Sequence, residues 1–258
     1  MRVNHTDNPI KVLGQYLLEG LYPQKKSCAF CGRHWSLSRL SAGLCPICLQ
    51  AWLQIRAYHP ICPVCGSFDC GNPCAGPCSD MKTLDCIIAA APYSGVYRQR
   101  IMAFKYNGYK SLADPLAYMM SGAWREKEQI LLSGSDRAPV LVPVPMHIEK
   151  EKARGYNQSR LLAYALSREL GFPVQELLCR PVEGRIQAGL DKRQRQTALD
   201  QVFQWARVTS QSGGAAILVD DVVTTSATLE SCGKILADNG FDTVWGLTFA
   251  GGVGLGAR

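Results

Sequence analysis

The sequence predicts an α/β protein whose parallel sheet is preceded by a small cysteine-rich region. Short apolar runs with the composition of buried strands are separated by segments in which apolar residues recur at helical spacing. This alternation of strand and helix is typical of a parallel sheet covered on both faces. Ten of the twelve cysteines lie between Cys28 and Cys86, where the first predicted strand begins. The cysteines therefore mark a region of their own ahead of the sheet.

These patterns divide the chain into three predicted parts. Residues 1–27 hold an amphipathic helix and a linker, 28–82 form the cysteine-rich region and 83–258 hold the sheet. We expect strands over 86–91, 140–145, 174–178, 216–219 and 244–249. We expect helices over 10–22, over 98–123 with a break at Asn107–Gly108, up to about 170, and over 227–238. The first helix is short and has few basic residues, so packing on the protein is favoured over binding at a membrane surface.

Length, composition and charge narrow the class of protein. The 258 residues are enough for a sizeable core, and no run of eighteen apolar residues could span a membrane. Residues 1–9 are polar and lack the apolar segment of a signal peptide, so we expect a cytoplasmic protein. The net charge of +7 favours polyanionic partners.

The spacing of the cysteines predicts structural zinc. Each Cys-x2-Cys knuckle offers two thiolates to one metal, and two knuckles complete a tetrahedral site. Because cytosolic thiols are kept reduced, the clustering favours metal ligands over disulfides. The first predicted site is Cys28, Cys31, Cys45 and Cys48. Four thiolates leave no open position for a substrate, so the metal would stabilise the fold.

A second zinc site would begin with a further knuckle, Cys62 and Cys65. Three cysteines follow at spacings of four, and we expect Cys74 and Cys78 to complete the site, with Cys70 left over. Whether the knuckles pair in sequence or cross over is open at this point, as is the number of zinc ions, one or two. The two sites together would make a double zinc ribbon.

Two stretches could bind nucleic acid. Between residues 93 and 110, basic and aromatic residues alternate without acids, a pattern suited to single-stranded nucleic acid. Lys105, Tyr106 and Lys110 are the candidates there, although part of this stretch has the spacing of a buried helix face. Arg193 and Arg195 belong to a second basic stretch, which is either a cationic flap over a ligand or a solvated face.

The strongest candidate site follows the apolar run 216–219. Two acids, Asp220 and Asp221, close the predicted strand, and a hydroxyl-rich turn leads into the helix that begins near Ala227. The free N–H groups at such a helix start suit a phosphate. Carboxylates beside a phosphate repel it, so we assign them to sugar hydroxyls or a divalent metal. The simpler interpretation is an ordinary strand-to-helix turn in which one acid caps the helix.

This stretch resembles the phosphoribosyl-diphosphate (PRPP) loop of type I phosphoribosyltransferases. In that loop, apolar residues precede the pattern acid-Asp-x-x-Thr-Thr-Gly-x-Thr, and here Ser226 replaces the glycine. If that position needed a positive φ, serine would cost about 1 kcal/mol or more. The resemblance implies a Rossmann-like, phosphoribosyltransferase-type domain that binds PRPP with Mg2+. It places the ribose on the two acids and the 5-phosphate on Thr224, Thr225, Ser226, Ala227 and Thr228.

The order of all motifs resembles the ComF, or GntX-like, family from Cys28 to Phe249. The motifs are the paired knuckles, Phe104 to Gly108, Pro143-Val144-Pro145, Arg154 to Gln158, Gln187 to Leu190 and the acidic loop. The resemblance places Arg154 near the diphosphate. It implies a protein of natural competence that handles incoming single-stranded DNA with a partner helicase.

Two functions remain open on the sequence. The first is DNA handling with PRPP as a regulatory ligand, which we favour because no acceptor-binding motif is visible. The second is an active phosphoribosyltransferase, a glycosyltransferase that transfers ribose 5-phosphate to an unidentified acceptor. A zinc-ribbon interaction protein with an inactive ligand site is the third and weakest interpretation.

Overall fold

The computed structural model describes residues 25–36, 41–71, 74, 78, 81–133, 137–180, 203–206 and 213–253. The predicted helix over 10–22, the motif Gln187 to Leu190, and Arg193 and Arg195 lie outside these residues. The chain divides into two compact units, residues 1–51 and 52–258, which are described separately below. The boundaries predicted after residues 27 and 82 stay predictions.

The first unit contains a small antiparallel ribbon and the start of a helix. Strand β1 (Lys25–Ser27) pairs with β2 (His34–Ser36), and the first cysteine knuckle forms the turn between them. Gly32 completes this turn with φ of 72°, a value that favours glycine. Helix α2 (Pro46–Tyr58) starts directly after Cys45 and crosses into the second unit.

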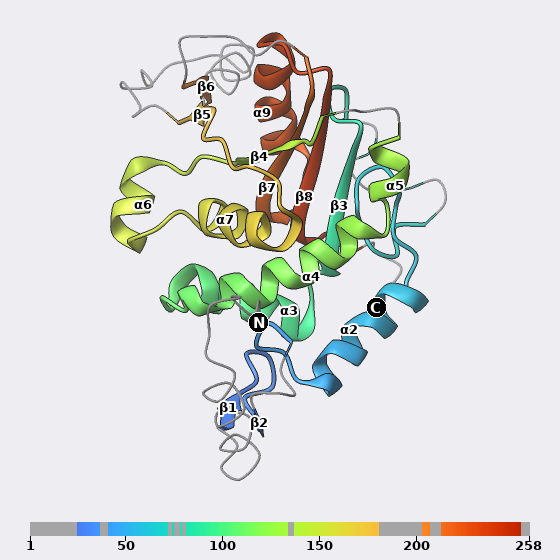
Figure 1. Cartoon of the computed structure of the whole chain (residues 1–258), viewed down its shortest axis with the longest axis vertical. Coiled ribbons are helices and arrows are strands. Elements are labelled where there is room, and N and C mark those ends of the chain that lie inside the picture. The colour runs from blue at the N-terminus through green and yellow to red at the C-terminus, as the bar shows by residue number, and fades with distance from the viewer. Residues whose placement is uncertain are drawn as a thin grey trace, which may run out of the picture. The chain divides into compact units, whose positions relative to one another are not determined.

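The second unit is built on a four-stranded parallel sheet (Figure 1). Its strands are β3 (Cys86–Pro92), β4 (Val140–Pro143), β7 (Ala215–Val223) and β8 (Thr243–Gly251). Among the described residues their order is β3-β8-β7-β4, and each neighbouring pair runs parallel. The predicted α/β class with a parallel sheet is therefore confirmed.

Helices connect these strands. The longer ones are α3 (Gly95–Tyr106), α4 (Ala113–Arg125), α7 (Gln158–Leu170) and α9 (Ala227–Asp238), and the shorter ones are η3 (Lys110–Leu112), α5 (Glu128–Leu131) and α6 (Ile148–Arg154). The predicted break near Asn107–Gly108 separates α3 from α4, and Gly108 has φ of 71°. Helix α9 has the predicted bounds. Helix α6 falls where the sequence indicated only a loop.

The two faces of the sheet are covered by different helices. Because successive side chains of a strand point to opposite faces, Val244 and Trp245 of β8 face opposite ways. Val244 lies in a buried cluster with Leu229 and Leu236 of α9, whereas the Trp245 ring lies 5.5 Å from that of Trp124 in α4. One face is therefore covered by α9 and the other by a layer that includes α4.

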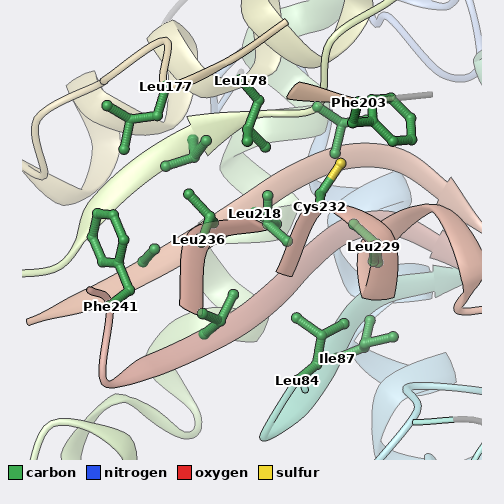
Figure 2. Packing of buried hydrophobic residues seen from close by; sticks show 14 of the residues in the cluster. Leu84, Ile87, Leu177, Leu178, Phe203, Leu218, Leu229, Cys232, Leu236 and Phe241 are labelled. Atoms are coloured by element: carbon green, nitrogen blue, oxygen red, sulfur yellow. The ribbon is translucent and has the colours of Figure 1, made fainter. Parts of the chain in front are cut away.

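The cluster under α9 forms one core of this unit (Figure 2). Leu229, Cys232 and Leu236 recur at helical spacing and pack with Leu218 of β7. A Cβ atom at Gly246 of β8 would lie 3.1–3.3 Å from Ile87 and Leu229 side chains, so the glycine lets these groups approach. This packing fixes the helix whose first turn follows the acidic pair.

The edge strand β3 is covered by the second half of α2. Trp52 Nε1 donates to the carbonyl of Ala90 at 2.8 Å, and Arg56 donates to the carbonyls of Ala89 and Ala90 at 2.9 and 3.1 Å. These donors occupy carbonyl groups that would otherwise be free on a strand edge. Arg56 also pairs with the exposed carboxylate of Glu126.

The strand predicted over 174–178 is wrong in its extent. Val174 makes a single bridge to Leu141, and the next strand, β5, covers only Leu178–Cys179. It pairs with β6 (Gln204–Trp205) in a separate antiparallel ribbon. Glu176 instead turns outward to Arg160, with 3.0 Å between Oε2 and Nε. Within the described part of the chain, no helix has the length and apolar character needed to cross a bilayer.

Candidate functional site

The acidic pair lies at the carboxyl end of the sheet, inside β7. The sequence predicted that the acids close the strand, but β7 continues to Val223 because β8 still pairs with it there. On the other side β4 ends at Pro143, opposite Val219. Asp220 and Asp221 thus follow the point where one neighbouring strand stops, which is where ligands bind in open parallel sheets.

Asp220 is held by the first turn of α7, which follows β4 and α6 in the chain. Its Oδ1 accepts hydrogen bonds from the Ser159 hydroxyl at 2.8 Å and from the Asp221 backbone N–H at 2.9 Å. Asn157 caps α7 by accepting from the backbone N–H of Ser159, and its Nδ2 donates to the carbonyl of Val144 at 3.2 Å. These hydrogen bonds hold the motif Arg154 to Gln158 next to the acidic pair.

Asp221 is paired with a cation from α3. The Nζ of Lys105 lies 2.9 Å from Oδ1 of Asp221, and only 5% of Asp221 is exposed. The sequence assigned Lys105 to nucleic acid, and the structure places it against the acidic pair. Sequence reasoning also missed Ser159, which directly follows the motif Arg154 to Gln158 in the sequence.

Burial and mutual repulsion perturb both acids. Burial and the neighbouring Asp221 carboxylate raise the pKa of Asp220 to about 7. Burial also raises the pKa of Asp221, although Lys105 and then Arg154 oppose the shift. Burial and repulsion make two adjacent carboxylates unfavourable, so their presence indicates a site that binds a cation or hydrogen-bond donors.

The hydroxyl-rich turn leads into α9 as the phosphate hypothesis requires. Thr224, Thr225, Ala227 and Thr228 are exposed, so they are open to a ligand. Ser226 is 1% exposed, and its hydroxyl has no hydrogen-bond partner. Its φ is −70°, so serine at this position carries no left-handed strain. The N–H groups of the first turn and the helix dipole favour an anion here.

A second buried polar group without a partner lies on α7. Gln158 is 1% exposed, and neither its amide oxygen nor its amide nitrogen is hydrogen-bonded. It directly precedes Ser159, the residue bonded to Asp220. Buried polar groups normally find a partner, so each such group needs an explanation.

Arg154 and the end of α3 form a basic and aromatic surface beside the acids. The Arg154 guanidinium lies 5.1 Å from the centre of the Tyr106 ring, and Lys110 Nζ lies 5.0 Å from that of Tyr156. Tyr106 is 64% exposed and Tyr109 55%. We call Tyr106, Tyr109, Lys110 and Arg154 the basic–aromatic surface. The other half of this stretch is core, as expected: Tyr97, Ile101 and Phe104 are buried.

A cavity of about 290 Å³ opens at the same end of β4. Pro145, Met146 and Leu178 give it an apolar part, and Asn157 and Arg180 add polar groups. Its lining includes Asn157, the N-cap of the helix whose Ser159 bonds to Asp220.

The first cysteine group brings together Cys28, Cys31, Cys45 and Cys48. The sulfurs of Cys31 and Cys45 are 3.8 Å apart, which matches the edge of about 3.8 Å in a tetrahedron with zinc–sulfur bonds of about 2.3 Å. Burial alone raises the pKa of Cys28, but backbone N–H groups, first that of Cys31 and then that of Cys45, lower it to about 7. This group could hold zinc.

The second group, in the second unit, brings together Cys62, Cys65, Cys74 and Cys78. The knuckles are thus grouped in sequence, and Cys70 is left out. The sulfurs of Cys65 and Cys74 are 3.7 Å apart. Burial alone raises the pKa of Cys62, but backbone N–H groups, first that of Cys65, lower it to about 6. The donor set again fits zinc, and the two groups together fit the predicted double zinc ribbon.

The segment that carries Cys62 and Cys65 is bonded to β3 and to the residue after β8. The N–H of Ile87 in β3 donates to the carbonyl of Val64 at 2.7 Å, and the N–H of Phe68 donates to that of Gly252 at 2.9 Å. A Cβ atom at Gly66 would lie 2.8 Å from the carbonyl oxygen of Ile87, so glycine is required at this contact.

Fold and site define an α/β protein with an acidic pair at the strand ends and two four-cysteine groups. No model of a protein family matches the chain. It is similar to Competence protein F of Haemophilus influenzae, with 35% identity over 114 residues, 43% of this chain and 50% of that protein. It is also similar to Competence protein ComFC of Bacillus subtilis, with 26% identity over 148 residues, 57% of this chain and 56% of that protein. The predicted resemblance to ComF proteins is therefore confirmed.

The chain spans about half the length of the curated relatives it matches. Among solved structures, that of the allosteric regulatory enzyme of purine biosynthesis matches 50% of this chain and 26% of its own, with 16% identity and a TM-score of 0.31. A likeness this weak supports no conclusion about function.

Proposed function

We propose that this chain is a ComF-like competence protein that handles single-stranded DNA and binds PRPP with Mg2+. The observation that carries the ligand site is the pairing of Asp220 and Asp221 with the start of α9, where the Ser226 hydroxyl is buried without a partner. The ribose hydroxyls would donate to the two carboxylates, and the 5-phosphate would accept from Thr224 to Thr228. Mg2+ prefers oxygen ligands, so the carboxylates fit it. Zinc in the cysteine groups would be structural.

The DNA part of the proposal rests on the basic–aromatic surface. Exposed rings of Tyr106 and Tyr109 can stack on bases, and Lys110 can pair with phosphates. Arg154, at the border of this surface, would lie near the diphosphate of PRPP. The net charge of +7 adds a general attraction for nucleic acid. A competence helicase as partner and a cytoplasmic location belong to the same proposal.

The ligand site is tested by calorimetric comparison of three forms of the full chain. Asp220→Asn combined with Asp221→Asn removes both charges and should abolish PRPP binding in the presence of Mg2+. Asp238→Asn, an exposed acid at the other end of α9, should bind as the wild type does. Equal affinity in the double variant would remove the acids from the site.

The DNA surface is tested with a fluorescent oligothymidylate. Tyr106→Ala with Lys110→Ala should weaken binding on the order of tenfold or more, since each base–aromatic stack is worth about 1–3 kcal/mol. Tyr58→Ala removes an even more exposed ring from α2 and serves as the control. An unchanged affinity in the first variant would place the DNA elsewhere.

A second candidate function is phosphoribosyl transfer. The cavity of about 290 Å³ beside Asn157 favours it, because it could hold a small acceptor at the same end of the sheet. Release of diphosphate from PRPP in the presence of nucleobases would support transfer. Binding of PRPP without release in that screen would support the regulatory role.

A further inference from the structure

The acidic pair of the ligand-free chain already holds a cation, which comes from the chain itself. Lys105 lies in the last turn of α3, and its Nζ is 2.9 Å from Oδ1 of Asp221. The side chains are 22% and 8% exposed, so water screens this pair only partly. The PRPP-loop motif contains the acids but not this lysine.

The surroundings keep Lys105 charged. Burial alone lowers the pKa of the ammonium, but the Asp221 carboxylate outweighs burial, and the pKa is raised overall. Arg154 is the next cation that acts on Asp221, and Asp220 is the next acid that acts on Lys105. Two acids and two cations therefore act on one another here, and the ion pair in direct contact is that of Lys105 with Asp221.

We propose that Lys105 is the internal counter-cation of this site and competes with the ligand for Asp221. A divalent cation binds Oδ1 of Asp221 only after the ammonium has left it, because the two cations repel each other. The lysine has a flexible four-carbon stem, so it can leave the carboxylate without movement of α3. The competition makes cation binding weak in the free protein and limits it to ligands that compensate for the lost ion pair.

The inference rests on the proposed function only for the identity of the natural ligand, and its test uses Mn2+ alone. Mn2+ is an oxygen-seeking substitute for Mg2+, and its binding is followed by the loss of the free-ion signal in electron paramagnetic resonance. Lys105→Met should bind Mn2+ on the order of tenfold or more tightly than the wild type, because Asp221 has lost its own cation. Lys105→Arg should remain as weak as the wild type.

Two further variants localise the effect. Adding Asp221→Asn to Lys105→Met should return Mn2+ affinity to the wild-type level. Lys234→Met removes an exposed lysine from α9 and should leave Mn2+ affinity unchanged. If Lys105→Met bound Mn2+ no more tightly than the wild type, the competition would be refuted.

A stability readout covers the case in which Lys105→Met folds poorly. The variant leaves a buried carboxylate without its partner, and a divalent cation should replace the missing ammonium. Mn2+ should therefore raise the Tm of Lys105→Met, or restore its folding, while leaving the wild type and the double variant nearly unchanged. No response in Lys105→Met would overturn the proposal. Failure of the wild type to bind PRPP would instead count against the proposed function and leave this comparison intact.

Discussion

The hydroxyl of Ser159 donates a 2.8 Å hydrogen bond to Oδ1 of Asp220, and so joins the first turn of α7 to the acidic end of β7. The bond stabilises the charged form of Asp220 against the burial that raises its pKa. It also fixes the carboxylate relative to Gln158, whose amide has no partner. The start of α7 and the acidic end of β7 therefore form one site.

Ser159→Ala should weaken PRPP binding by roughly three- to tenfold, because a hydrogen bond to a charged group is worth about 1.5–3 kcal/mol and water can replace part of it. The measurement is calorimetric titration at fixed Mg2+. Ser133→Ala, which removes a hydroxyl bonded to a local carbonyl, is the matched control. Full affinity in Ser159→Ala would show that this bond does not orient the ligand-binding carboxylate.

The pKa of Asp220 predicts a pH dependence of stability. The pKa of Asp220 is about 7 in the folded protein and lower in the unfolded chain, so at a pH between the two values the folded protein binds one proton more. The stabilisation that this proton provides is present in full below about pH 4 and is lost as the pH rises through about 7. Asp220→Asn should therefore gain stability relative to the wild type over this range, by about 1–3 kcal/mol. Urea unfolding at about pH 5 and about pH 8 measures the difference. A constant difference would contradict the assigned pKa.

Much of this arrangement could be predicted from local patterns. The apolar run of β7, the helical stripe of α9 and the knuckle spacing each depend on nearby residues, and the structure has them as predicted. The extension of β7 through Asp220 could not be foreseen, since it depends on pairing with β8. The partner of Lys105 was missed for the same reason, because the ion pair joins residues far apart in the sequence. The Ser226 strain that the loop comparison suggested is absent because its φ is negative.

Arg56 should stabilise the edge of the sheet far more than its visible ion pair does. Its side chain is 7% exposed and donates to two β3 carbonyls, whereas Glu126 is 50% exposed. Arg56→Leu should cost about 2–4 kcal/mol, since buried carbonyls lose their donors. Glu126→Gln should cost about 1 kcal/mol or less, as surface ion pairs do. Chemical unfolding of both variants measures the two losses in the free energy of unfolding. Equal losses would mean that the ion pair with Glu126 dominates.

Replacement of Cys70 and replacement of Cys74 should have different effects on the zinc content of the protein. Cys74 lies in the second cysteine group and Cys70 does not, and burial followed by the neighbouring Cys74 raises the pKa of Cys70 to about 12. Elemental analysis should find that Cys74→Ser loses one of two zinc ions and that Cys70→Ser keeps both.

Loss of the second zinc should also lower the stability of the sheet, because Val64 is bonded to β3 and Phe68 to Gly252, directly after β8. Thermal unfolding of Cys74→Ser with Cys70→Ser as the control tests this. The reverse pattern of zinc loss would replace Cys74 by Cys70 as the ligand.

Calorimetric titration of the zinc-loaded wild-type chain with PRPP and Mg2+ tests the central claim most directly. The account predicts saturable binding of one ligand per chain, dependent on the divalent cation and absent from the Asp220→Asn, Asp221→Asn variant. A folded, zinc-loaded wild type that gives no binding would contradict it, and the acidic pair, Ser226 and Gln158 would then require another ligand.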